Sequence, residues 1–148
     1  MTWPRITTGP DAPVDAHIYP LAAAQRLQEA AAALAPEERE SLAPMYGGGG
    51  WWQRACARTG TERLTGNATR VVRGTPMDMG TGLPEHTDAA MFATAIRRQP
   101  EGVAEALHDE CATAAARAHA GGQAAVAAAL VALAAFIFAA CHDREVTQ

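Results

Sequence analysis

The chain of 148 residues fits one domain with room for a hydrophobic core, and its net charge of −4 comes with only 19% charged residues. Alanine makes up about a quarter of the chain, which favours helix. Lysine is absent and all twelve basic residues are arginine, which excludes a lysine-dependent phosphate loop and is typical of a GC-rich bacterial or phage genome.

The N-terminal residues 1–19 are predicted to form an irregular arm, because prolines interrupt them and no hydrophobic periodicity is present. They lack the apolar run of a secretory signal. The three cysteines, Cys56, Cys111 and Cys141, are widely spaced and form no CxxC pair. We therefore expect a cytoplasmic protein with reduced thiols.

Residues 20–44 are predicted to form two helices. Pro20 suits the first position of a helix, and Pro36, followed by two glutamates, starts a second and shorter helix that ends near Ala43. The apolar residues of the first helix fall on one face: Leu21, Ala24, Leu27, Ala31 and Leu34.

Residues 45–86 are predicted to form an insert of irregular or β structure. Four consecutive glycines precede Trp51, and neither a lysine nor a preceding strand supports a phosphate or dinucleotide loop. We interpret the glycines as a flexible connection, with a short helix opening at Trp51 as the alternative. Gly66 and Asn67 between short β-favouring runs predict a small β-hairpin over 61–73.

The insert is the basic part of an acidic chain. Residues 45–76 carry five arginines and one acid, net +4, whereas residues 1–44 carry net −3 and residues 77–148 net −5. The arginines of such a segment either form ion pairs with the acids that flank it or are exposed and bind an anion. The candidate ligand-binding residues are Trp51, Trp52, Arg54, Arg58, Arg63, Arg70 and Arg73.

Two interpretations of these residues remain open. In the favoured one, the arginines pair with acids of the flanking helices, and the tryptophans belong to the core. In the other, the segment is an exposed surface that stacks bases on tryptophan and binds phosphates through arginine. Since adjacent residues of a short element point in different directions, one of Trp51 and Trp52 is expected in the core and the other is expected to be freer.

Residues 87–148 are predicted to contain three helices, over 87–98, 100–120 and 123–142, with Gly121 and Gly122 ending the second. The last two are equal in length and predict an antiparallel helical hairpin. The apolar stripe of the second helix is expected at Val103, Leu107, Cys111, Ala114 and Ala118. In the third helix we expect buried side chains at Leu130, Leu133 and Ile137.

The segment 124–141 contains no polar residue and is long enough to cross a membrane. Ten of its eighteen residues are alanine, which weakens that reading, and a helix that is apolar all round is also typical of a central core position. The central core helix is preferred, with a C-terminal membrane anchor as the alternative.

No catalytic or metal site is predicted. His108 precedes Cys111 by one helical turn, and we interpret the pair as a surface histidine beside a buried thiol rather than as a thiolate pair. In the predicted hairpin, Cys141 lies about 9 Å along the axis from His108, too far for a shared zinc ion. The residues that resemble soft copper ligands are interpreted as packing residues: Met77, Met79, His86 and Met91.

Together these patterns predict a mainly α-helical single domain, 1–148, with an irregular arm, N-terminal helices, a central insert and a C-terminal helical region. The expected function is a small non-catalytic binding or assembly module that packs through alanine-rich helices against itself or a protein partner. The alternatives are a binder of nucleic acid or a phosphorylated ligand through residues 51–73, an enzyme with an unrecognised site, and a membrane-anchored protein. No cofactor is expected.

Overall fold

The protein is mainly helical, as predicted, in the part of the chain that the structure, a computed structural model, describes: residues 20–38, 51–64, 71 and 88–141. These residues contain no strand. The helices are α1 (Pro20–Ala32), α3 (Trp51–Thr59), the 3₁₀ helix η1 (Glu62–Leu64), α5 (Asp88–Arg97), α6 (Glu101–Ala120) and α7 (Ala124–Cys141). Residues 36–38 are also helical, as expected after Pro36.

Several predicted features lie outside the described residues, among them the arm 1–19, the end of the short helix near Ala43, the glycine run 47–50 and residues 72–86 of the insert, with Met77, Met79 and His86. The division of the chain into an arm, N-terminal helices, an insert and a C-terminal region therefore stays a prediction.

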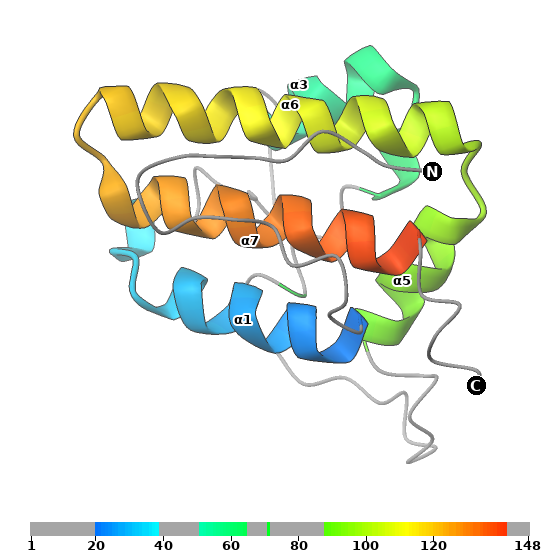
Figure 1. Cartoon of the computed structure of the whole chain (residues 1–148), viewed down its shortest axis with the longest axis horizontal. Coiled ribbons are helices and arrows are strands. Elements are labelled where there is room, and N and C mark those ends of the chain that lie inside the picture. Colours follow the sequence, from blue (N-terminus) through cyan, green and yellow to red (C-terminus); the bar gives the residue numbers. More distant parts are fainter. Residues whose placement is uncertain (1–19, 39–50, 65–70, 72–87, 142–148) are drawn as a thin grey trace.

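Helix α7 is the centre of the fold (Figure 1). It lies between α6 on one side and α1 on the other, and it also packs against α5. Leu130, Leu133 and Ile137 are buried, as predicted. Of the residues expected on the buried face of the first helix, Ala24, Leu27 and Ala31 are buried on α1, and Leu34 is buried just after its end. The side chain of Leu21 lies outside the described ones.

By length and composition alone, α7 could cross a membrane, and it is the only helix in the described part of the chain that could. Its 18 residues have a mean hydropathy of 2.6, and 61% of them are buried inside the protein. A central core helix meets the same length and composition criteria. The packing of α7 against three other helices agrees with the preferred reading of this segment.

Two glycines with positive φ end helices in the same way. Gly122 has a φ of 79°, and the Gln123 amide donates to the Ala118 carbonyl at 2.8 Å. Gly60 has a φ of 75°, and the Thr61 amide donates to the Cys56 carbonyl at 2.8 Å. Both are Schellman caps, in which a glycine adopts the left-handed conformation that a side chain disfavours. After Gly122 the chain reverses direction, so that α6 and α7 lie side by side (Figure 1).

The buried stripe of α6 differs from the predicted one. Leu107, Cys111 and Ala118 are buried as expected, but Val103 and Ala114 are only half-buried. Three residues complete the stripe instead: Ala104, His108 and Ala115. The stripe is rotated because alanine makes several faces of this helix equally apolar, so that its neighbours α7 and α3 decide which face is covered.

The β-hairpin predicted over 61–73 is not seen in the described part of that segment. Glu62–Leu64 form η1, whose N-terminal side is fixed by the Schellman cap of α3, and Leu64 and Val71 are buried in the core. The local β-favouring composition is overridden here by helix capping and by burial of Leu64. Residues 65–70, 72 and 73 lie outside the described residues.

Candidate binding surface between α3 and α6

The helix that opens at Trp51 is the alternative that sequence analysis left open for this segment. Its inner side carries Trp52, which has no exposed surface. The Trp52 and Phe92 rings meet edge to face at 6.4 Å, and Phe92 stacks on Phe136 at 4.9 Å. This chain of three rings joins α3 to α5 and α7. Because Trp52 is enclosed, its faces are not available for a base or sugar to stack on.

The predicted arginines are distributed over different parts of the chain. Arg54 and Arg58 lie one turn apart on α3, and both are exposed. Arg63 belongs to η1, and Trp51 is the first residue of α3. Arg70 and Arg73 lie outside the described residues. The structure therefore brings Arg54 and Arg58 to one surface, while Trp52 points from the same helix into the core.

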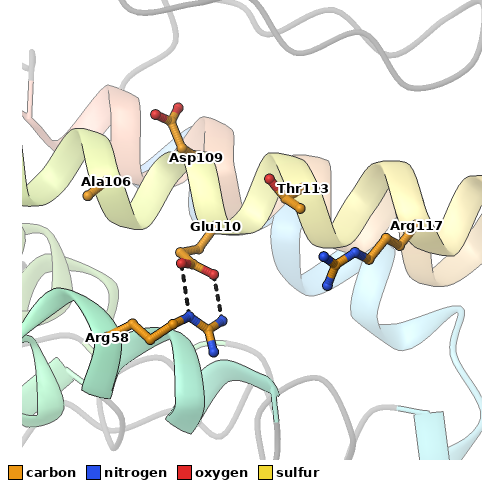
Figure 2. Close-up of a pocket in the computed structure, with 6 residues that line it drawn as sticks. All are labelled: Arg58, Ala106, Asp109, Glu110, Thr113 and Arg117. Carbon is orange, nitrogen blue, oxygen red and sulfur yellow. Dashed lines mark hydrogen bonds and ion pairs between the residues drawn. The ribbon is translucent and has the colours of Figure 1, made fainter.

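Arg58 is joined to Glu110 of α6 by a bidentate ion pair (Figure 2). Its Nη2 donates to Glu110 Oε1 at 2.6 Å, and its Nε donates to Oε2 at 3.0 Å. The hydrogen bond from Arg58 lowers the pKa of Glu110, and the same bond raises the pKa of Arg58. The side chains are 54% and 28% exposed, so solvent screens their attraction. For Arg58, pairing with a flanking acid is the arrangement that the favoured interpretation expected.

A polar hollow of about 360 Å³ lies beside this ion pair, between α3 and α6. Its lining residues are Arg58, Ala106, Asp109, Glu110, Thr113 and Arg117. Figure 2 shows the Arg117 side chain running back along α6 toward Glu110 and Arg58, while Asp109 points to the other side of the helix. This direction is expected, because helical side chains lean toward the helix N-terminus. The positive charge of Arg117 contributes to the lowered pKa of Glu110.

Sequence analysis missed Arg117 and Thr113 as members of this surface. A signal was available, because Glu110, Thr113 and Arg117 are spaced three and four residues apart and so share one face of a helix. That signal could not identify the partner helix, since the pairing of Arg58 with Glu110 spans 52 residues of sequence.

The interpretation of His108 as a surface residue is wrong: its side chain is 1% exposed. The ring packs near Phe138 of α7, and Nδ1 lies 3.4 Å from Asp109 Oδ1. Burial lowers the pKa of His108 and raises the pKa of Cys111 well above its usual value. Both shifts favour the uncharged forms, so this pair does not supply a thiolate nucleophile.

The described residues contain no group of three histidine, cysteine or acidic side chains arranged to hold a metal ion. None of the three cysteines forms a disulfide bond with another described residue; Cys56 and Cys111 are buried and Cys141 is half-buried. The chemistry that this surface offers is therefore guanidinium, carboxylate and hydroxyl hydrogen bonding around the hollow.

Comparison with known proteins gives no match: no family model fits the sequence, and no curated protein or solved structure is significantly similar to the chain.

Proposed function

We propose that the protein is a small non-catalytic assembly module that associates with a second copy of itself through the outer face of α6. The observation that carries this proposal is an exposed seam of six residues, the outer seam, with alternating spacings of four and three. Its members are Gly102, Ala106, Asp109, Thr113, Ala116 and Ala120. This spacing is that of the contact positions of paired helices.

The side chains of the outer seam support a helix–helix contact. All except Asp109 are small, so a second helix can approach the backbone closely. The opposite side of α6 is covered by α7 and α3, so the seam is the part of this helix left for a partner. The apolar residues of α7, by contrast, are used within the chain.

Three further properties belong to the same proposal. The chain acts as a single domain in which α6 and α7 form an antiparallel helical hairpin. The protein is cytoplasmic, and the absence of a disulfide bond among its three cysteines supports this. It is of bacterial or phage origin, which the lysine-free composition supports.

The experiment is size-exclusion chromatography with light scattering over a range of protein concentrations, without detergent. The expected result is a mass that rises from one copy to two with concentration. Ala116→Glu, which places a long charged side chain on the outer seam, should keep the protein at the mass of one copy. Ala32→Glu is the matched control, since Ala32 is an exposed alanine on α1.

A mass of one copy at every concentration would contradict self-association. Equal behaviour of the two variants would contradict the assignment of the contact to α6. Circular dichroism and the melting temperature should be unchanged in both variants, because both positions are exposed.

A further inference from the structure

Four charged residues line the hollow, two arginines and two acids, but only three of them lie on its Arg58 side (Figure 2). Arg58 and Arg117 carry two positive charges, and Glu110 between them carries one negative charge, so the three groups together carry a formal +1. Asp109 also lines the hollow, but its carboxylate points to the other side of α6 (Figure 2). A net positive charge at the edge of a hollow attracts an anion.

The donors of these residues are only partly used. Glu110 accepts from Nε and Nη2 of Arg58, which leaves Nη1 on the outer edge of the guanidinium. Arg117 makes no ion pair or side-chain hydrogen bond within the described part of the chain. Thr113 lies on α6 between Glu110 and Arg117, and its hydroxyl is turned toward the Asp109 side of the helix (Figure 2).

The orientation of Arg58 is fixed before any ligand arrives. A bidentate pair holds the guanidinium plane in one direction, which reduces the side-chain entropy that a ligand must otherwise overcome. Arg117 lies on the same helix as Glu110, two turns further along, and its side chain extends back toward it. Two guanidinium groups at the edge of one hollow form the kind of fork that recognises planar or tetrahedral oxyanions.

We propose that the hollow between α3 and α6 binds an oxyanion, a phosphate or carboxylate group, held by Arg117 and the outer edge of Arg58. Glu110 neutralises one of the two guanidinium charges and leaves one positive charge for the ligand. The lining of the hollow shares Ala106, Asp109 and Thr113 with the outer seam of α6. Arg58 and Arg117, the residues that would contact the anion, lie outside the seam, so self-association and anion binding can still fail separately.

The experiment is a titration of the ¹⁵N-labelled protein with inorganic phosphate and, separately, with acetate, at constant ionic strength set with chloride. The observed signals are the side-chain Nε–Hε resonances of the arginines. The expected result is a saturable shift of Arg117 and Arg58, while Arg26, an exposed arginine on α1, does not saturate.

The two anions distinguish the sources of the ligand. Saturation by phosphate alone assigns a phosphate or phosphate ester, and saturation by acetate as well assigns a carboxylate. No saturable shift with either anion would overturn the proposal.

Variants test which residues are responsible. Arg117→Gln should weaken binding about tenfold, because one of two guanidinium groups is lost. Glu110→Gln should strengthen binding, since it raises the formal charge of the three groups from +1 to +2. A loss of affinity in Glu110→Gln would contradict the charge count on which the site rests.

Arg26→Gln is the matched control, because it removes the same charge from α1, on the far side of α7 (Figure 1). It should leave the affinity within about twofold of the original, since an isolated exposed charge is strongly screened at this distance. If both variants lost the same affinity for the anion, its binding would depend only on the overall charge of the protein. That result would contradict the proposed site.

Discussion

Helices α7 and α3 are held in the protein by different kinds of interaction. All 18 residues of α7 are without polar side chains, and the helix packs against α6, α1 and α5. Helix α3 has nine residues, packs mainly against α6 and η1, and exposes Arg54, Ala57 and Arg58. One helix is stabilised by apolar area spread along its length, and the other by a short buried face with one large aromatic side chain, Trp52, and by one directional ion pair.

This difference has a physical consequence. Apolar burial is non-directional and adds up over many residues, so no single polar contact decides where α7 lies. A helix of nine residues is too short to be stable alone and depends on its tertiary contacts. The position of α3, and with it the position of Arg58 beside the hollow, therefore depends on Trp52 more than on any surface interaction.

The largest expected effect is that of Trp52→Ala. Removal of a fully buried tryptophan should lower the free energy of unfolding by about 3–5 kcal/mol, because it leaves a cavity where Trp52 meets Phe92. Urea denaturation followed by circular dichroism measures this change. Arg54→Ala, an exposed position on the same helix, is the control and should change stability little. A small effect of Trp52→Ala would show that α3 is not anchored in the core.

The next effect in size is that of Leu133→Ala in the centre of α7. Leu133 has no exposed surface, so the substitution should lower the free energy of unfolding by about 2–5 kcal/mol. Val126→Ala, at a half-buried position of α7, is the matched control and should have a smaller effect. An unchanged thermal melt for Leu133→Ala would mean that this face of α7 contacts solvent or lipid instead of the core.

The two helices also differ in how far the sequence predicts them. Burial of Leu130, Leu133 and Ile137 follows from the apolar run, because the large side chains of a helix without polar residues must be covered by protein or by lipid. The end of α6 follows from its glycine pair, since only glycine adopts the left-handed conformation there without strain. Both are local or compositional properties that need no knowledge of the partner elements.

What sequence analysis missed depends on contacts between elements far apart in the chain. The rotation of the α6 stripe and the burial of His108 are decided by α7 and α3, and periodicity cannot rank alanine-rich faces against each other. Sequence analysis predicted that arginines of the insert pair with acids of the flanking helices, but it could not identify Arg58 and Glu110 as the pair. The hollow with Arg117 was not expected at all, because it requires the relative placement of α3 and α6.

A smaller effect is expected from the titration of His108. Burial lowers its pKa in the folded protein, so below the ordinary value of about 6.5 the unfolded chain binds a proton that the folded protein does not. Stability should therefore fall as pH decreases from about 6.5 toward the lower folded pKa, and should level off below that value. The measurement is urea denaturation at several pH values between about 5 and 8, a range that includes the ordinary pKa of histidine.

His108→Gln should remove this slope, whatever its effect on stability at neutral pH. His119→Gln is the control, because His119 lies on the same helix but is exposed, and it should leave the slope in place. Glu110 does not interfere, because the hydrogen bond from Arg58 lowers its pKa below the ordinary range of a glutamate, well under the pH range of the measurement. A slope that persists in His108→Gln would assign the pH dependence to another group.

The smallest expected effect is that of the Arg58–Glu110 ion pair on stability. Arg58 is 54% exposed, and ion pairs in solvent contribute little, so Arg58→Gln should destabilise far less than Trp52→Ala. The bidentate geometry still predicts coupling: Arg58→Gln and Glu110→Gln should each remove the same interaction, so the double variant should lose less stability than the sum of the two single variants.

This coupling energy should shrink as salt is added, since solvent ions screen the pair. It should also disappear at acid pH, because the lowered pKa of Glu110 makes its contribution present above about 4.5 and lost as pH falls through the folded value. Urea denaturation of the four proteins at low and high salt measures all of this. Strict additivity at low salt would mean that the pair does not hold α3 on α6, and that the aromatic anchor at Trp52 alone places Arg58 beside the hollow.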